Sequence, residues 1–393
     1  MAPPAPEVLT PDAARRGALR AQCLLEPTAS IEEALEQTVG VSGAIPSGSL
    51  SLAVRVSAFA LPTLDHALED DRSVVRVPAM RGAVYLLPTR LASNGLALAK
   101  PGQFRPALMR AGMKEETYDA LVESIEDMLT GKHLTGTELR RALGSERIER
   151  DLPKGAFVFF LRGLTHEGRI LRVGVRGGAR SQAFEYGRAD EWLGAPLRIP
   201  NETEGLSRLL PPYLEAHGPA SVKDLAWWAG VTLKVARSAL RSVAPREVRL
   251  EGREDVLYAS ESSLAQSERR GPDASVTLLP HWDPYLTAHV DRSRYLAERW
   301  RDRVIDRGGN STNVILMDGK ASGVWDYSEG LLAYAGFESP LSPRSLRAAS
   351  RPFLPVLGDL DVVERARAPH LHEGGQNAFR APLRGVSPAR PES

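Results

Sequence analysis

The sequence contains a single cysteine, Cys23, which excludes an internal disulfide framework and a zinc site built from several cysteines. Cys23 stands in a helical pattern beside Leu19 and Leu24, where a buried thiol is expected rather than a nucleophile. No apolar run is long enough to cross a bilayer, and the first residues, MAPPAPEVLTPDAARR, lack the apolar core of a secretory signal. These absences lead us to expect a cytoplasmic protein without membrane contact.

The chain also has almost no excess charge, because 50 Lys and Arg residues oppose 49 Asp and Glu residues, for a formal net charge of +1. A protein held on nucleic acid by bulk charge is strongly basic, so any nucleic-acid surface here must be local. At 393 residues the chain exceeds the usual size of one hydrophobic core. We therefore expect several compact units.

The stretch from 206 to 258 predicts three short helices followed by a hairpin. A His-Gly-Pro stop at 217–219 ends the first helix, and Ser221 and Thr232 are expected to cap the next two. Alternating apolar and polar residues between 247 and 258 predict the hairpin. This order is typical of a winged helix, whose third helix can enter a DNA major groove.

The third helix and hairpin of this stretch carry an excess of basic residues. Between positions 234 and 253 there are six basic residues and two acidic ones, a balance that suits contacts with phosphate. Lys234, Arg237 and Arg241 lie on the helix, away from its apolar side, and we expect them to contact DNA. The alternative is a helix-turn-helix that serves only for packing, with a solvated basic face.

The same order of helices and hairpin occurs twice more in the chain. Residues 10–90 predict one copy, whose strands are joined at an exposed turn around Arg81. Residues 118–186 predict another copy, whose Gly-rich tip carries Arg176 and Arg180. These three arginines are expected to contact DNA, and plain solvated side chains are the alternative.

Beyond position 272 the pattern changes to short strands, and Asp318-Gly319 is a strong signal for a two-residue hairpin turn. The sequence therefore predicts an α+β protein with tandem winged-helix domains and a C-terminal, β-rich, barrel-like module. The expected division is a first winged helix with linking helices at 10–115, a second at 116–195, a third at 200–265, the β-rich module at 272–365 and a flexible tail at 366–393.

This order, with LPHWDPY at 279–285, Asn310 and DLAWWAG at 224–230, resembles the AlkZ/YcaQ-like DNA glycosylase family of winged-helix DNA-binding proteins. The resemblance extends over roughly residues 10 to 365. It implies a C-shaped protein that holds duplex DNA and, in active members, hydrolyses the N-glycosidic bond of alkylated nucleobases. It implies no metal and no organic cofactor.

The resemblance also points to the segment after the second predicted helix, where active members carry Gln-x-Gln or Gln-x-Asp. The matching positions here are Ser42 and Ala44, so both functional side chains are missing. Base removal passes through an oxocarbenium-like sugar, which a carboxylate or amide stabilises and which neither residue suits. Asp283 is a candidate substitute, although Asp before Pro more often fixes a turn.

We therefore expect a monomeric, nucleoid-associated protein that binds double-stranded DNA in DNA repair. It would have the architecture of the glycosylases without their standard N-glycosidic bond cleavage. The alternative is a DNA glycosylase that excises alkylated bases with other catalytic residues, so whether the protein is an enzyme stays open at this point.

Overall fold

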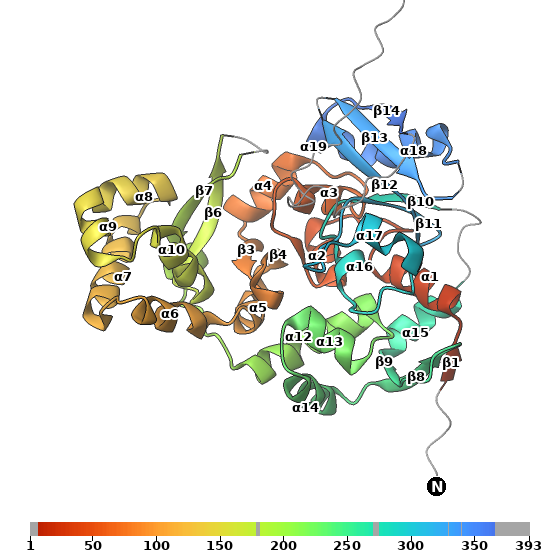
Figure 1. Ribbon diagram of the computed structural model, residues 1–393, viewed down its shortest axis with the longest axis horizontal. Helices are drawn as coiled ribbons and strands as arrows, with labels where there is room; N and C mark the ends of the chain where they lie inside the picture. The colour runs from red at the N-terminus through yellow and green to blue at the C-terminus, as the bar shows by residue number, and fades with distance from the viewer. Residues whose placement is uncertain (1–6, 178–180, 270–274, 329, 339, 366–393) are drawn as a thin grey trace, which may run out of the picture.

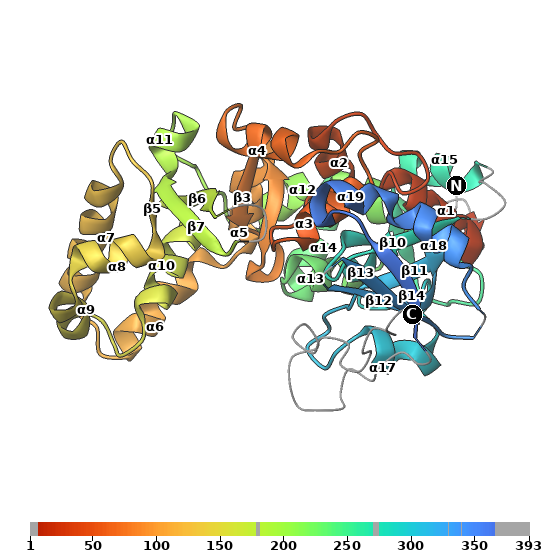
Figure 2. The same ribbon diagram turned by 90° about the horizontal axis from the view of Figure 1, so that it is seen from above.

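The computed structural model describes residues 7–177, 181–269, 275–328, 330–338 and 340–365, and these residues have a mixed α+β fold with three sheets. Figure 1 shows a smaller helical lobe at one end, formed by α6 to α10, and a larger lobe that holds both the N-terminal and the C-terminal elements. A six-stranded sheet lies between the two lobes (Figure 2).

The six-stranded sheet has the order β2-β4-β3-β6-β7-β5. The first two hairpins predicted from the sequence are present as β3–β4 and β6–β7, and they join through the pair Arg76 and Arg172. Sequence patterns do not predict this joining, because it depends on pairing between distant strands. The strands are β2 (Val41–Ser42), β3 (Val74–Pro78), β4 (Val84–Pro88), β5 (Leu134–Thr135), β6 (Ile170–Arg176) and β7 (Ala183–Arg188).

The helices of the N-terminal half follow the capping signals of the sequence. Thr10 and Ser30 accept hydrogen bonds as N-caps of α1 and α2, and Thr135 forms a capping box with Glu138 at the start of α8. The bounds are α1 (Pro11–Ala21), α2 (Ile31–Thr38), α3 (Ser47–Ala53), α4 (Leu61–Glu69), α5 (Ala92–Leu98), α6 (Phe104–Arg110), α7 (Glu115–Leu129), α8 (Gly136–Leu143), α9 (Ser145–Asp151), α10 (Phe157–His166) and α11 (Ala189–Leu193).

The stretch predicted to hold three helices and a hairpin forms these elements. Ser221 and Thr232 are the N-caps of α13 and α14, as expected, and Gly230 ends α13 with φ +75°. The hairpin β8–β9 gains a third strand, because the N-terminal β1 pairs with β8 in parallel. The bounds are β1 (Glu7–Leu9), α12 (Glu202–His217), α13 (Val222–Ala229), α14 (Leu233–Val243), β8 (Arg246–Leu250), β9 (Leu257–Ala259) and α15 (Glu261–Glu268).

The C-terminal β-rich module is an open five-stranded sheet of order β10-β11-β12-β13-β14, so the expectation of a barrel-like module is wrong for the described residues. Asp318 and Gly319 both have positive φ in the turn between β11 and β12, as the hairpin signal predicts. The bounds are β10 (Val276–Leu279), α16 (Pro284–Thr287), α17 (Arg301–Val304), β11 (Val314–Met317), β12 (Lys320–Ser328), β13 (Leu331–Gly336), α18 (Pro343–Ser350), α19 (Leu354–Leu357) and β14 (Asp361–Glu364).

The physical reason for the open sheet is that other elements cover its apolar face. Trp325 and Tyr334 of this sheet share one buried core with Leu35 and Leu50 of the N-terminal helices. A sheet that buries one face against helices does not need to close on itself. Each fully buried side chain of this size contributes about 2–3 kcal/mol, so the two ends of the chain stabilise each other. The tail predicted at 366–393 lies outside the described residues.

Candidate functional site

A pocket of about 370 Å³ lies beside the six-stranded sheet and brings together three of the site residues predicted from the sequence. Ser42 and Ala44 line it from the segment after α2, and Arg81 lines it from the turn between β3 and β4. Phe184 of β7 and Trp282, just before α16, contribute further walls. Segments that are far apart in the sequence therefore meet around one cavity.

The segment at 42–44 is a tightly packed turn. The Ser42 side chain is largely buried, and its Oγ accepts a hydrogen bond of 3.3 Å from the backbone N–H of Ala44. A Cβ atom added to Gly43 would lie only 2.7 Å from Cγ1 of Val84, so any other residue at this position would require Val84 to shift. The segment presents a hydroxyl and a methyl group to the pocket, where an amide or a carboxylate would be needed to stabilise a cationic sugar.

Two residues of the pocket wall, Arg81 and Trp282, have left-handed backbone conformations, with φ of 58° and 60°. A non-glycine residue adopts this conformation at a cost of about 1–3 kcal/mol, and such strain is concentrated at functional sites. Both residues are therefore held in place by the structure around them rather than by local preference.

Arg81 is held by the third helical unit. Its Cζ lies 4.1 Å from the centroid of the Trp227 ring, a cation–π contact that contributes roughly 0.5–2 kcal/mol. Gly230 permits the approach, because an added Cβ there would lie 2.9 Å from Cα of Arg81. Burial lowers the pKa of Arg81, and the neighbouring Arg292 acts in the same direction. Trp227 therefore positions a guanidinium at the pocket.

The pocket is cationic and aromatic. Arg172 lines it together with Arg81, and none of the described residues that line it is Asp, Glu or His. Cζ of Arg172 lies 4.7 Å from the centroid of Phe184, and burial raises the pKa of Tyr85, which therefore stays protonated at neutral pH. Aromatic faces and guanidinium donors suit a nucleobase, which stacks and accepts hydrogen bonds.

Two amide side chains also line the pocket, and the sequence reasoning did not select either as a site residue. Nε2 of Gln182 donates to the carbonyl oxygen of Ile45 over 3.3 Å, next to Ala44. The amide of Asn310 is fixed on both sides, since its Oδ1 accepts from Nε1 of Trp282 and its Nδ2 donates to Asp306. No sequence signal singles out Gln182, because only the joining of the two hairpins through β3 and β6 brings it beside residue 44.

Asp283, the candidate substitute carboxylate, does not line this pocket. Its side chain is fully buried, and its two oxygens accept hydrogen bonds from Arg55, from Oγ of Ser51 and from the backbone N–H of Tyr285. It is the N-cap of α16, the turn role that Asp before Pro suggests. Nearby His281 hydrogen-bonds to the buried Ser47, 2.8 Å from its Nε2.

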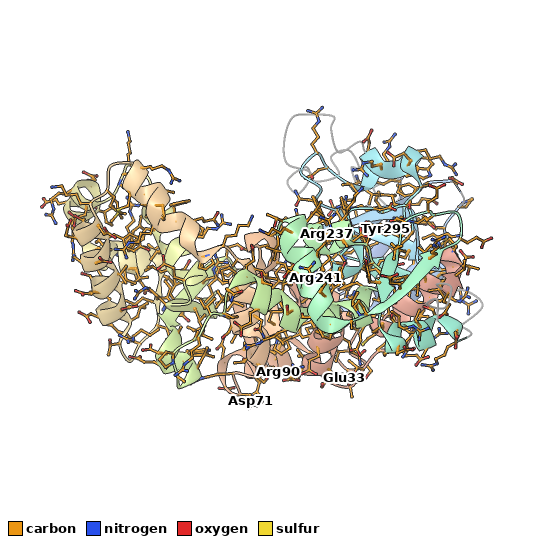
Figure 3. The ribbon with its side chains drawn as sticks, turned by 90° about the horizontal axis from the view of Figure 1, so that it is seen from below. Glu33, Asp71, Arg90, Arg237, Arg241 and Tyr295 are labelled. Carbon is orange, nitrogen blue, oxygen red and sulfur yellow. The ribbon has the colours of Figure 1, made fainter. Side chains whose placement is uncertain are left out.

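The other predicted DNA contacts lie on separate elements. Lys234, Arg237 and Arg241 are exposed along α14, and Figure 3 shows Arg237 and Arg241 following each other on this helix. Arg176 pairs with Glu138 and Glu185, so its charge is balanced. Arg180 lies outside the described residues.

The ion pair of Arg176 also contributes to a lowered pKa of its partner Glu138. A backbone hydrogen bond from Thr135, together with Arg176, lowers the pKa of Glu138 to about 2. By contrast, Lys234, Arg237 and Arg241 form no ion pair with any described residue of the chain. Of the predicted DNA contacts outside the pocket, those on α14 are therefore cations that no ion pair with a described residue neutralises.

A larger cavity of about 750 Å³ lies between α1 and the C-terminal sheet. It has side chains of both signs, such as Arg15, Arg299 and Glu338, and none of the predicted site residues lines it. Within the described ranges, no helix is long and apolar enough to span a membrane. In the same part of the chain, no group of three or more His, Cys, Asp or Glu side chains is arranged to hold a metal ion.

Comparisons with known proteins identify the family and the fold. Residues 37–348 match the model of the DNA glycosylase AlkZ-like family. A protein of Streptomyces sahachiroi described as an interstrand DNA cross-link repair glycosylase is 26% identical over 329 residues, which are 79% of this chain and 85% of that protein. The solved structure of Streptomyces sahachiroi DNA glycosylase AlkZ has the same fold, with a TM-score of 0.73 and 22% identity over 91% of this chain and 99% of that chain.

Proposed function

Because this chain belongs to the AlkZ-like DNA glycosylase family, as the sequence resemblance indicated, we propose that it is a DNA-repair protein that binds duplex DNA and lacks the standard cleavage of the N-glycosidic bond. The observation that carries this proposal is the pocket at Ser42 and Ala44. Its walls suit a nucleobase, and Ser42 and Ala44, the two positions that the sequence resemblance matches to the catalytic motif, carry neither an amide nor a carboxylate.

The chemistry of the N-glycosidic bond explains how this pocket would recognise a base without excising it. Cleavage develops positive charge on the sugar, and a carboxylate or amide beside the sugar lowers that barrier by roughly 3 kcal/mol, or about a hundredfold in rate. Ser42 is short and already accepts a hydrogen bond from Ala44. We therefore propose binding of damaged duplex DNA in which the pocket accepts an extruded base and leaves the glycosidic bond intact.

The architecture we propose for this binding is three winged helices, at 10–115, 116–195 and 200–265, supported by the β-rich unit at 272–365. The exposed basic face of α14 and the turn at Arg81 support the assignment of DNA contacts to these units. We further propose that the protein acts as a monomer, in the cytoplasm on the nucleoid, without a metal or an organic cofactor.

The test uses the full-length protein with duplex DNA that carries alkylated purines. Binding is measured by fluorescence anisotropy against the unmodified duplex, and base release is measured as abasic sites cleaved by alkali. We expect salt-sensitive binding, tighter to at least one duplex with an alkylated purine than to the unmodified duplex, and no release above the uncatalysed rate. Multiple-turnover release would overturn the noncatalytic proposal, and absence of any duplex binding would overturn the function as a whole.

A second candidate function, a glycosylase with non-standard catalytic residues, is favoured by one observation. Gln182 brings an amide beside Ala44, and its Oε1 is left to orient a water molecule because its Nε2 is bonded to Ile45. If release of a base is found, Gln182→Leu should abolish it while binding persists. An unchanged rate in this variant would exclude Gln182 as its source.

A further inference from the structure

The charge of the pocket at Ser42 and Ala44 does not suit a cationic ligand. Alkylation of a purine at N7 or N3 gives the base a positive charge, and a site for such a base needs a carboxylate or a free aromatic face. This pocket has Arg81 and Arg172 on its wall and, among the described residues that line it, no acidic side chain. Resting on the proposed function, we propose that it receives an uncharged modified purine and discriminates against cationic alkylated bases.

The layer behind the wall reinforces this charge. Arg76 is paired with Arg172 across the sheet, and its Cζ lies 5.3 Å from the centroid of Phe184. Arg292 lies beside Trp227 and Gly309. Its Cζ is 5.5 Å from the centroid of the Trp227 ring, and its Nη2 donates a hydrogen bond to the carbonyl oxygen of Gly309. A bound base would therefore face two arginines directly, with two more behind them.

Acidic groups are present nearby, but they act from behind the wall. Asp306 is bonded to the amide of Asn310, and Asp65 and Glu69 act on the buried Arg76. Coulomb energy falls with distance, so the arginines on the wall dominate the field that a base in the pocket would meet. Burial and the neighbouring Arg172 lower the pKa of Arg76 only to about 10, so it remains charged at neutral pH.

The aromatic groups of the site point to the same conclusion. Cation–π recognition needs a free ring face. Phe184 of the pocket wall is already in contact with Arg76 and Arg172, and Trp227, outside the pocket, is in contact with Arg81. Tyr85 and Trp282 also line the pocket, where they share its wall with Arg81 and Arg172. A cationic ligand would be repelled by these arginines, whereas a site that binds cations attracts them.

Guanidinium groups favour the opposite kind of ligand. Arginine donates to the O6 and N7 acceptors of guanine, and alkylation at N7 removes one acceptor while it adds the charge. A purine modified at O6 or on its exocyclic nitrogen is uncharged and keeps N7 free. A neutral purine is also a poor leaving group unless it is protonated, so a pocket that selects it and has no acid on its described wall binds without cleaving.

The experiment compares two duplexes that differ only in charge at one base. Both carry the modified base on a 2′-fluoro sugar, which prevents loss of the cationic base. The base is 7-methylguanine in one duplex and 7-methyl-7-deazaguanine, an uncharged base of the same shape, in the other. We expect the full-length protein to bind the uncharged duplex about tenfold more tightly at low salt. Equal affinity, or tighter binding of the cationic duplex, would overturn the proposal, and this comparison requires no variant.

Matched variants locate the source of the preference. Arg172→Met and Arg81→Met should each reduce the ratio of the two affinities, whereas Arg176→Met, on the same hairpin as Arg172 but outside the pocket, should leave it unchanged. The pocket variants should bind a duplex with O6-methylguanine more weakly, because methionine lacks the hydrogen-bond donors that arginine offers to N7. An equal loss on unmodified DNA would overturn the proposal by making these arginines phosphate contacts.

The proposed function and this inference fail in different ways. If the wild-type protein binds none of the duplexes, DNA binding itself is wrong. If it binds damaged DNA better than unmodified DNA but does not prefer the uncharged base, the proposed function stands and only the charge selection is wrong.

Discussion

Arg55 and Asp283 form a bidentate ion pair, with N–O distances of 2.8 and 2.7 Å, in which both side chains are completely excluded from solvent. The pair connects the end of α3 to the N-cap of α16, across 228 positions of the chain. Oγ of Ser51 donates a further hydrogen bond of 2.7 Å to the same carboxylate. The residue that directly follows the pocket residue Trp282 is thereby anchored to the end of α3, the helix that follows the 42–44 turn.

Asp283→Ala should lower the free energy of unfolding by about 3–5 kcal/mol, because it leaves the Arg55 guanidinium buried without its partner. Asp127→Ala, at an exposed position of α7, is the control and should change it by less than about 0.5 kcal/mol. Urea denaturation followed by circular dichroism measures both. If Asp283 acted chemically on DNA instead, the variant would keep its stability and lose activity alone.

The basic face of α14 should be a phosphate contact. Replacing Lys234, Arg237 and Arg241 with Ala is expected to weaken binding to all duplexes alike and to reduce the slope of log affinity against log salt by about 0.9 for each lost contact. A matched control exists in Arg344, Arg347 and Arg351, which have the same spacing at α18 in the C-terminal module. Affinity unaffected by the α14 changes, or reduced equally by the control, would refute the assignment.

Restoring the motif should restore part of the chemistry. Ser42→Gln with Ala44→Gln, or with Ala44→Asp, places an amide or carboxylate in the pocket, and such a group contributes about a hundredfold in rate. Release of 7-methylguanine measured over days at neutral pH checks this expectation. Folding and DNA binding of the variant are verified first, because the 42–44 turn is tightly packed. No recovery in a folded, DNA-binding variant would mean that the pocket itself has diverged.

Trp227 should affect DNA binding mainly through Arg81. Trp227→Leu removes the ring that holds the guanidinium, so it should weaken binding to the duplex with O6-methylguanine to a similar extent as Arg81→Met. The double variant should then lose little more, with a coupling energy of about 0.5–2 kcal/mol in a double-mutant cycle. Additive losses would show that the two side chains act independently.

Acid should destabilise the protein through buried histidines. Burial lowers the pKa of His217 to about 3 and that of His166 to about 4, whereas in the unfolded chain each takes up a proton near pH 6.5. Below pH 6.5 the unfolded state therefore binds more protons, and stability falls by about 1.4 kcal/mol per pH unit for each histidine until its folded pKa is reached.

Urea titrations at pH 7, 6 and 5 measure this loss. His217→Gln should be less stable at pH 7, because His217 bonds to Gln22 and to the carbonyl oxygen of Thr38, but its stability should depend less steeply on pH. His66→Gln is the control, since His66 is largely exposed and a hydrogen bond to Asp70 raises its pKa rather than lowering it. An unchanged slope in His217→Gln would disprove the role of this histidine.

Local sequence features determined most of the helices and hairpins. Caps such as Ser221 and Thr232 and turns such as Asp318-Gly319 act through bonds or dihedral angles within a few residues, so their outcome can be read from the chain alone. The family resemblance could also be recognised from the sequence, because short continuous segments such as 279–285 carry it.

Tertiary structure decided which of these residues share a site. The sequence indicated Ser42, Ala44 and Arg81, but their meeting with Gln182 and Arg172 depends on the joining of two hairpins into one sheet. It likewise proposed Asp283 as a carboxylate for catalysis, and its burial against Arg55 became apparent only from the packing of segments 228 positions apart. The charge that a pocket presents to a ligand depends on residues that are far apart in the sequence, so no pattern along the chain predicts it.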